Sequence, residues 1–217
     1  MREKTPLIKI PFTLERPNPP FEAGEIRYPE ALVRHFLKTY TKTGAKVFDP
    51  FAGLGTTLFV AEEMGRKPFG IEADRKRYEW VAGQLENWQN LHNADASKLA
   101  SLHLPKMDFC ITSPPYMPKH HKWNPLFAGN PKHAGYDKYL AQMTRIFKAL
   151  ASRMKRGATV VIQADNLRHG AHYTPLVRDL GIAAGASLTL QNEIIVEWQN
   201  PKPDYPYTHC LIFKNLT

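Results

Sequence analysis

The sequence predicts an α/β protein built on a doubly wound, mostly parallel sheet that ends in an antiparallel hairpin. Helix-like and strand-like segments alternate from residue 28 to about residue 185, and this alternation is typical of parallel sheets. The last two strand-like segments follow one another directly, which predicts the hairpin. In sheets of this kind, ligands bind at the carboxyl ends of the strands, where the strand order reverses.

The chain is expected to divide into two parts. Residues 1–25 are predicted to form an irregular N-terminal arm, because four prolines fall between positions 11 and 20. Residues 26–217 are predicted to form a single domain, since a chain of this length can bury one sizeable core.

Helices are predicted where apolar residues recur every three or four positions, as they do at Leu32, Phe36 and Tyr40. Glycines end several of these helices, and Asp74 can cap the third. The predicted helices span residues 32–40, 56–64, 74–88, 136–156 and 173–185. Strands are predicted where short apolar or β-branched runs lie between turns. The predicted strands span residues 46–48, 67–72, 107–112, 158–163, 187–198 and 209–213, with long loops at 117–135 and 200–208.

The charge balance favours a polyanionic partner. Lys and Arg total 29 against 20 Asp and Glu, a formal net charge of +9, and cations that contact phosphates release condensed counterions. The sequence has neither an apolar stretch of about 20 residues nor a signal segment, so we expect a cytoplasmic protein with no membrane partner. Cys110 and Cys210 lie in apolar runs and are expected to be buried thiols.

A glycine-containing turn follows the first predicted strand. Residues 48–57 read Phe-Asp-Pro-Phe-Ala-Gly-Leu-Gly-Thr-Thr, and Gly53 and Gly55 let a ligand approach the backbone at the start of the next helix. A P-loop would need Gly-Lys-Ser/Thr, which is missing, and a dinucleotide fingerprint would need a third glycine where Leu58 stands. The turn therefore favours a cofactor without a pyrophosphate.

This segment resembles the cofactor motif of the amino-methyltransferases of DNA and of related RNA enzymes, with Leu54 where family members often have Ser. The resemblance implies a Rossmann-like class I methyltransferase fold with a seven-stranded sheet, and S-adenosylmethionine as the cofactor. It assigns cofactor binding to Asp49, Pro50, Phe51, Gly53, Gly55, Thr56 and Thr57.

Three further residues are candidates for the cofactor site. Glu72 ends the next strand about 20 residues after the glycine turn, where an acid can hydrogen-bond a ribose diol. The alternative is a solvated surface acid. By the resemblance, Asp95 matches a position that often holds the adenine amino group, and its alternative interpretation is a turn residue. Tyr28 matches a region that contacts the methionine part of the cofactor in the family.

A second motif, Ser113-Pro114-Pro115-Tyr116, follows the apolar strand 107–112. It resembles the catalytic motif of the same family, which is usually Ser-Pro-Pro-Tyr in cytosine-N4 enzymes and Asp- or Asn-Pro-Pro-Tyr in adenine-N6 enzymes. A base amino group is a poor nucleophile, so the Ser113 hydroxyl and the Pro114 carbonyl would accept its N–H bonds and direct its lone pair. Successive prolines fix the backbone, and Tyr116 offers a stacking face for a flipped base. The alternative is a simple proline-rich turn.

Basic and aromatic residues after this motif are typical of a surface that follows a nucleic-acid backbone beside a flipped base. The candidates are Lys119, His120, His121, Lys122, Trp123, Lys132 and, in a later loop, Lys202. No metal is expected, because adjacent histidines rarely bind one ion and no Cys or carboxylate has ligand spacing to them.

The leading hypothesis is methylation of cytosine N4 in DNA. Sequence-specific DNA enzymes of the family usually carry a large target-recognition region, whereas only about 20 loop residues follow the catalytic motif here. Specificity would then come from a short loop, a partner protein or homodimer, or a folded substrate. The alternatives are the same chemistry on structured rRNA or tRNA, adenine N6 in DNA, and a non-catalytic nucleic-acid-binding subunit. Carbon-5 cytosine chemistry is disfavoured, because no Pro-Cys nucleophile follows the strand.

Overall fold

The computed structural model describes residues 6–22, 27–127, 130–202 and 205–216. The strands are β1 (Leu7–Pro11), β2 (Lys46–Asp49), β3 (Lys67–Glu72), β4 (Leu91–Asn93), β5 (Met107–Thr112), β6 (Met154–Ala164), β7 (Leu167–His169), β8 (His172–Thr174), β9 (Thr189–Lys202) and β10 (Tyr205–Lys214). The α-helices are α1 (Glu30–Tyr40), α2 (Thr56–Glu63), α3 (Arg75–Ala82), α4 (Tyr136–Arg153) and α5 (Leu176–Gly185). Short 3₁₀ turns are η1 (Trp88–Asn90), η2 (Ala96–Ser101), η3 (Pro125–Phe127) and η4 (Pro131–His133).

One sheet of eight strands runs in the order β1-β9-β10-β6-β5-β2-β3-β4, and β7 and β8 form a separate hairpin. β2 to β6 pair in parallel, β10 lies antiparallel between β6 and β9, and β1 pairs in parallel with β9. The chain adds β3 and β4 on one side of β2 and then returns to add β5 and β6 on the other. The strand order therefore reverses between β2 and β5, where a ligand is expected.

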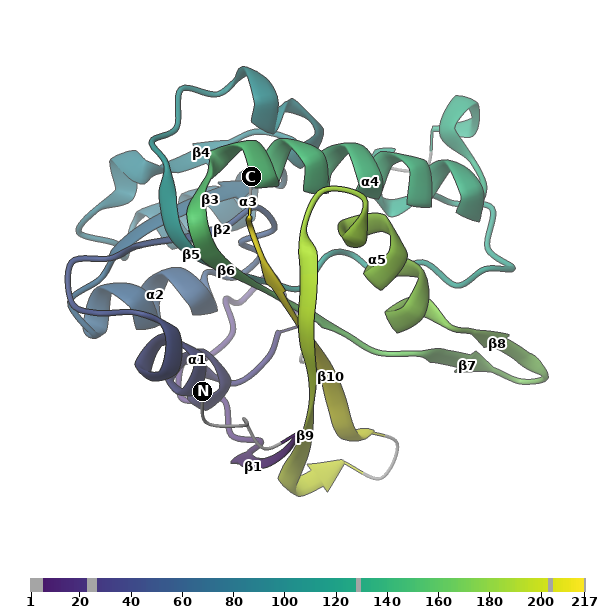
Figure 1. Ribbon diagram of the computed structural model, residues 1–217, viewed down its shortest axis with the longest axis horizontal. Coiled ribbons are helices and arrows are strands. Elements are labelled where there is room, and N and C mark those ends of the chain that lie inside the picture. The colour runs from purple at the N-terminus through teal and green to yellow at the C-terminus, as the bar shows by residue number, and fades with distance from the viewer. Residues whose placement is uncertain (1–5, 23–26, 128–129, 203–204, 217) are drawn as a thin grey trace.

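Helices cover both faces of the sheet (Figure 1). α1 and α2 pack on one face in a core that contains Val47 and Ile111, whereas α4 and α5 pack on the other in a core that contains Phe48 and Cys110. Successive strand residues point to opposite faces, so an apolar run without alternation supplies both cores. This confirms the predicted doubly wound architecture and its final antiparallel hairpin. Both cysteines are buried free thiols, as expected.

The N-terminal arm is not irregular throughout. Leu7–Pro11 form β1, in which Leu7 pairs with Ile195 and Ile10 pairs with Trp198. The prediction of an irregular arm was wrong for this stretch, because a proline excludes a central strand but is tolerated at the end of a short edge strand. β1 adds an eighth strand to the expected seven.

Several element boundaries also differ from the prediction. α3 ends before Gly83, although its apolar stripe continues to the buried Leu85. Tyr173 belongs to β8, and α5 begins only after Pro175. The predicted loop at 200–208 is largely strand, and its ladder shifts register between Tyr205 and Tyr207, where an intervening proline lacks the N–H that a regular ladder needs. The short strand β4 and the β7–β8 hairpin carry no clear periodicity and were not predicted.

In the described part of the chain, no helix combines the length and the apolar character needed to cross a bilayer.

Candidate active site

A cleft of about 1060 Å³ opens at the carboxyl ends of the parallel strands, across the point where the strand order reverses. Both sequence motifs line it, which places the ends of β2 and β5 at one site. The lining residues that were predicted are Tyr28, Asp49, Pro50, Phe51, Gly53, Thr56, Glu72, Ser113, Pro114, Pro115 and Tyr116. Gly55, Thr57 and Asp95 are described but do not line the cleft.

The glycine turn links β2 to α2 and is hydrogen-bonded to the end of β3. Gly53 and Gly55 have φ values of 54° and 79°, a region that favours glycine. The Gly53 N–H donates to a carboxylate oxygen of Glu72 at 2.7 Å, and the Ala52 N–H donates to the Ile71 carbonyl at 2.9 Å. A Cβ built at Gly53 meets only a carbonyl oxygen at 3.9 Å, so this side of the turn is open.

Gly55 has a different environment from Gly53. It is the N-cap of α2, and a Cβ built there would lie 2.7 Å from Cγ1 of Val81 and 3.0 Å from Phe59. The glycine therefore permits close packing of the turn against α3, and Gly55 supports the site from behind the ligand-facing surface.

Asp49 is buried at the end of β2 and organises the centre of the site. Its carboxylate accepts hydrogen bonds from the Thr112 hydroxyl at 2.6 Å, the Phe51 N–H at 3.0 Å and the Tyr28 hydroxyl at 3.2 Å. Tyr28 also hydrogen-bonds the Thr57 hydroxyl at 2.6 Å. Burial raises the pKa of Asp49, and these hydrogen bonds oppose that shift. Thr57 is thus connected to the cleft by its hydrogen bond to Tyr28, which also bonds Asp49.

Glu72 ends β3 and is buried, so it is not a solvated surface acid. Besides Gly53, the Asp74 N–H donates to it at 2.8 Å. Burial raises the pKa of Glu72, while these two N–H groups and the nearby Arg77 lower it. Arg77 itself lines the cleft and pairs with Glu22 at 2.9 Å. Sequence reasoning placed Arg77 only on a helix and missed its position at the site.

Asp95 caps the short η2 turn, where its carboxylate accepts the Ser97 N–H at 2.7 Å. Its neighbours Ala94 and Ala96 line the cleft. This geometry suits the turn interpretation of Asp95, and its contact with an adenine amino group stays a prediction.

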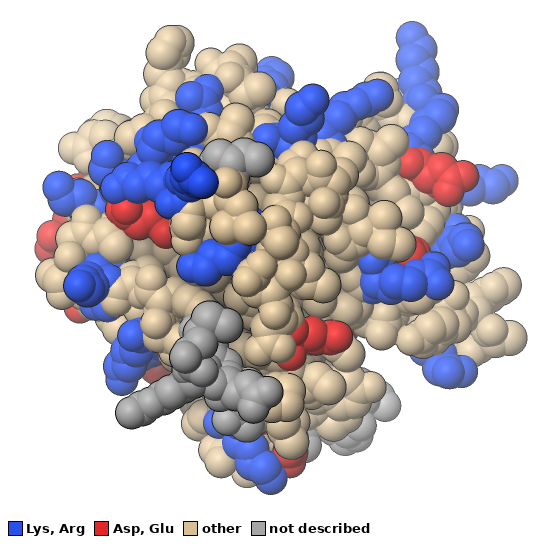
Figure 2. Space-filling view, viewed as in Figure 1, with Lys and Arg blue, Asp and Glu red and all other residues tan. Residues whose placement is uncertain are grey.

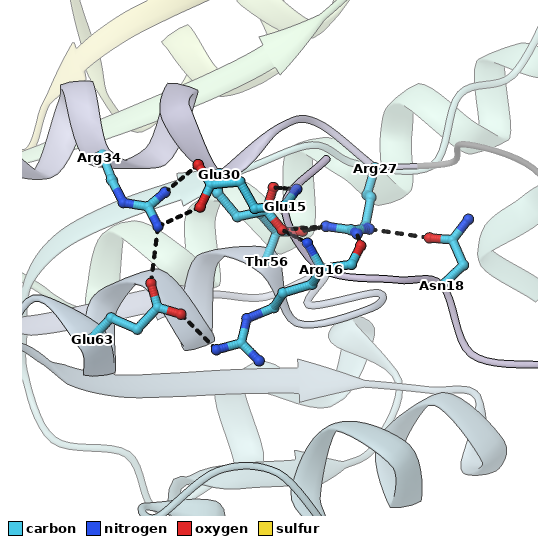
Figure 3. A network of polar contacts seen from close by, with 8 residues as sticks. All are labelled: Glu15, Arg16, Asn18, Arg27, Glu30, Arg34, Thr56 and Glu63. Atoms are coloured by element: carbon cyan, nitrogen blue, oxygen red, sulfur yellow. Dashed lines mark hydrogen bonds and ion pairs between the residues drawn. The ribbon is translucent and has the colours of Figure 1, made fainter. Parts of the chain in front are cut away.

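A buried ion pair lies beside the cleft (Figure 3). Arg27 lines the cleft and pairs with Glu30 at 2.6 Å, and the two side chains are 7% and 1% exposed. The guanidinium also donates to the Thr56 hydroxyl at 3.3 Å, to the Asn18 side chain at 3.3 Å and to the Arg16 carbonyl. This network joins the N-terminal arm, the start of α1 and the start of α2.

The Glu30 carboxylate also accepts hydrogen bonds from backbone N–H groups of the N-terminal arm. The N–H of Glu15 donates to one oxygen at 3.0 Å, and the N–H of Arg16 donates to the other oxygen at 3.3 Å. Burial alone would raise the pKa of Glu30, but the N–H groups of Glu15 and of Glu30 itself, together with the Arg27 guanidinium, bring it below its ordinary value. Arg34 and Glu63 extend the network at the surface (Figure 3).

The second motif is held rigidly at the end of β5. The Tyr139 hydroxyl from α4 donates to the Pro115 carbonyl at 3.0 Å. The Tyr116 hydroxyl donates to Gln163 at 3.1 Å and to Asp165 at 3.3 Å, both at the end of β6. Burial raises the pKa of Tyr116 well above its ordinary value, so the hydroxyl remains a donor. Ser113 lines the cleft beside this tyrosine.

An aromatic wall closes the end of the cleft next to the second motif. Phe12, Trp198 and Tyr205 line it, with ring centroids 5.2 Å apart for Phe12 and Trp198 and 6.3 Å apart for Trp198 and Tyr205. The Tyr205 hydroxyl donates to Asp165, which ties this wall to the Tyr116 network. Sequence reasoning missed Phe12 and Trp198, because only the pairing of β1 with β9 brings them together.

The predicted nucleic-acid-binding residues whose side chains the structure describes do not line the cleft. The residues from Lys119 to Trp123 are exposed on the loop after Tyr116, and Lys132 is exposed in η4. The Gly135 N–H donates to the Lys122 carbonyl at 3.0 Å and closes this loop. Lys202 ends β9, and its side chain lies outside the described residues. Among described residues, no three His, Cys, Asp or Glu side chains gather as a metal site.

Comparison with known proteins relates the cofactor side of this cleft to DNA methylases. The sequence profile of the N6/N4 DNA methylase family matches residues 13–83. Type II methyltransferase M2.DpnII of Streptococcus pneumoniae is 38% identical over 58 residues, and M.MjaI of Methanocaldococcus jannaschii is 34% identical over 58 residues. The matched segment covers 27% of this chain but only 22% and 19% of those relatives, about a fifth of their length.

Solved structures match over most of the chain. TrmN from Thermus thermophilus superimposes with a TM-score of 0.61 at 18% identity, over 85% of this chain and 48% of TrmN. A methyltransferase from Pyrococcus furiosus superimposes with a TM-score of 0.60 at 14% identity, over 93% of this chain and 89% of that protein. At this identity the likeness shows the fold, which is the class I S-adenosylmethionine-dependent methyltransferase fold predicted from the sequence.

Proposed function

We propose that the protein transfers a methyl group from S-adenosylmethionine to the exocyclic amino nitrogen of cytosine in DNA, starting from the match of residues 13–83 to the N6/N4 DNA methylase family. The observation that carries the proposal is the shared cleft. The family's glycine turn and Ser113-Pro114-Pro115-Tyr116 end the two strands on either side of the reversal in strand order, so a bound cofactor and a target base would meet there.

The described residues fit this cofactor. A volume of about 1060 Å³ lies at the upper end of the range for small-molecule sites, which leaves room for a cofactor and an extruded base. The open side of Gly53 admits a ligand against the backbone, and Glu72 presents a carboxylate for the ribose diol, with Ile71 and Ala73 beside it in the lining. Asp49 and Tyr28 form the polar floor between the two motifs.

Residues of this chain would orient the target base relative to the methyl group of the cofactor. S-adenosylmethionine brings a methyl group already activated by its sulfonium, so positioning supplies most of the remaining catalysis. The Ser113 hydroxyl and the Pro114 carbonyl would accept the two N–H bonds of the base and direct the nitrogen lone pair at the methyl carbon. Tyr116 would stack on the base, and its bonds to Gln163 and Asp165 fix the plane of its ring.

Cytosine N4 is preferred over adenine N6 because the motif begins with Ser113 and not with Asp or Asn. The hydroxyl oxygen of a serine lies closer to the backbone than the side-chain oxygen of an aspartate or an asparagine does. The same chemistry on structured RNA is the second candidate. It is favoured by the short connection between β5 and α4, which leaves little chain for reading a DNA sequence.

Incubation with methyl-labelled S-adenosylmethionine tests the proposal directly. Unmodified genomic DNA and total RNA are offered separately, and the products are digested to nucleosides and analysed by mass spectrometry. We expect label on the amino group of deoxycytidine. Label on deoxyadenosine would correct the base, label only in RNA would correct the substrate, and no label from a protein that binds the cofactor would contradict the proposal.

A further inference from the structure

Two segments far apart in the sequence pack together just outside the cleft. The Lys119 N–H, on the loop after Tyr116, donates at 2.8 Å to the hydroxyl of Thr174, which is buried at the end of the β7–β8 hairpin. The His120 ring lies almost parallel to the rings of His169 and His172 on the hairpin, with centroids 5.4 and 4.6 Å away. The loop and the hairpin therefore form one surface, which we call the hairpin surface and define as residues 119–123 and 167–174.

The hairpin surface projects from the molecule. Figure 1 shows the β7–β8 hairpin reaching outward beyond the end of α5. Hydrogen bonds within the hairpin pair Leu167 with Thr174 and His169 with His172, so it is an ordered ribbon. Its connection to the loop begins three residues after Tyr116. A polymer that lies on this surface would therefore pass directly beside the cleft.

The chemistry of the surface suits a polyanion with flat rings. Lys119, Lys122 and Arg168 are exposed on it, and neither residues 117–135 nor residues 166–178 contain an Asp or a Glu. Basic side chains also outnumber acidic ones on the face of the molecule shown in Figure 2. The hairpin surface thus carries three cations and no acidic residue of its own next to the site, which suits contacts to phosphates.

Two aromatic side chains on the hairpin surface are unusually exposed. Trp123 is 68% exposed and Tyr173 is 52% exposed, and the Arg168 guanidinium lies 5.5 Å from the centre of the Tyr173 ring. Burial in the core does not explain aromatic rings at these positions. Stacking against nucleobases does, because each base offers a flat face and each stacked pair contributes roughly 1–3 kcal/mol.

We propose that the hairpin surface holds the DNA strand that flanks the target base, with its cations on the phosphates and Tyr173 and Trp123 against neighbouring bases. The proposal rests on the proposed function and deepens it, because it assigns substrate positioning to the β7–β8 hairpin. The hairpin, which packs against the loop after Tyr116, would supply part of the DNA binding that a separate recognition region provides in other DNA enzymes of the family.

Binding of a short fluorescent DNA duplex, measured by anisotropy over a series of salt concentrations, tests this inference. Arg168→Glu and Lys122→Glu are expected to weaken binding roughly ten-fold each and to lower the salt slope by about one per lost phosphate contact. The matched control is Lys38→Glu, an equal charge reversal at an exposed position of α1 on the opposite face of the sheet. Equal losses in all three variants would overturn the inference.

A second pair of variants tests stacking without changing charge. Tyr173→Ala is expected to weaken duplex binding, whereas Tyr173→Phe keeps the ring and should bind like the wild type. Equal binding by both would overturn the role of the ring. A loss confined to labelled RNA, with DNA binding unchanged, would overturn the assignment to DNA.

Calorimetry with S-adenosylmethionine separates this inference from the proposed function. The surface variants should bind the cofactor as the wild type does, since the hairpin does not line the cleft. If wild-type protein transfers no methyl group but the variants still lose DNA affinity, the surface stands and the proposed activity fails. If transfer to DNA occurs and the variants bind and methylate DNA normally, the activity stands and the surface assignment fails.

Discussion

At the scale of single residues, Ser113 carries the chemical part of the proposal. Ser113 lines the cleft beside Tyr116, and its proposed role is to accept one N–H of the base. We expect Ser113→Ala to lower the methylation rate by about 10-fold or more, because an oriented polar contact in the transition state is lost. Single-turnover rates measure the effect, and calorimetry should show unchanged cofactor affinity.

The control for this substitution is Ser152→Ala, which removes the same hydroxyl from an exposed position on α4. It should leave the rate unchanged. A Ser113→Ala enzyme that turns over at the wild-type rate would remove Ser113 from the mechanism.

If Glu72 binds the cofactor as proposed, cofactor affinity is expected to depend on pH. Burial raises its pKa, so the carboxyl becomes protonated at a higher pH than an exposed glutamate. Above the raised pKa the carboxylate would accept hydrogen bonds from the ribose, and this ability would be lost as the pH falls through that pKa. We therefore expect S-adenosylmethionine affinity, measured by calorimetry, to decrease toward acidic pH.

Glu72→Gln provides the comparison. The amide does not titrate, so its affinity should be lower at neutral pH and flatter across the acidic range. A wild-type decrease that persists unchanged in Glu72→Gln would assign the pH dependence to another group, with Asp49 the first candidate because burial raises its pKa as well.

At the scale of elements, we expect the two glycines of the turn between β2 and α2 to differ, with Gly53 acting in cofactor binding and Gly55 in packing against α3. Gly55→Ala is expected to destabilise the fold by about 1–3 kcal/mol, because its new methyl group would lie 2.7 Å from Val81 at a positive φ. Gly53→Ala also has a positive φ but meets open space, so it should cost about 1 kcal/mol of stability and act mainly on cofactor affinity.

Urea denaturation and cofactor calorimetry on both variants check this prediction. The expected pattern is a larger loss of unfolding free energy in Gly55→Ala and a larger loss of affinity relative to stability in Gly53→Ala. The reverse pattern would mean that the cofactor approaches the turn from the α3 side.

The elements that local patterns define were predictable. The glycine turn and Ser113-Pro114-Pro115-Tyr116 each follow an apolar strand, so both were placed at strand ends from sequence alone, and Glu72 was placed at the end of β3. β1 was missed because its partner is β9, and no local pattern reveals a pairing between Leu7 and Ile195. The same non-local pairing brings Phe12 and Trp198 into the cleft.

At the scale of the whole molecule, the ion pair of Arg27 and Glu30 joins the N-terminal arm to the sheet and its helices. Removing one partner of a buried pair leaves a charge without compensation and typically costs about 3–5 kcal/mol. We therefore expect Glu30→Ala to lower the free energy of unfolding by about that amount in urea denaturation.

Glu79→Ala is the matched control, because it removes the partner of Arg75 from an exposed pair on α3. Exposed pairs contribute about 0–1 kcal/mol, so its denaturation curve should nearly coincide with that of the wild type. Equal effects of the two substitutions would mean that the arm docks independently of Arg27 and Glu30.

β1 also covers the β9 edge of the sheet. Without it, the long strand β9 would present a row of unpaired backbone N–H and C=O groups, which are a template for aggregation. β1 satisfies part of that row and exposes instead a strand of only five residues. It bears Lys9 and ends at Pro11, a cation and a residue without an N–H, and both discourage a further strand from joining. The arm that contributes Phe12 to the cleft therefore also favours colloidal solubility of the protein.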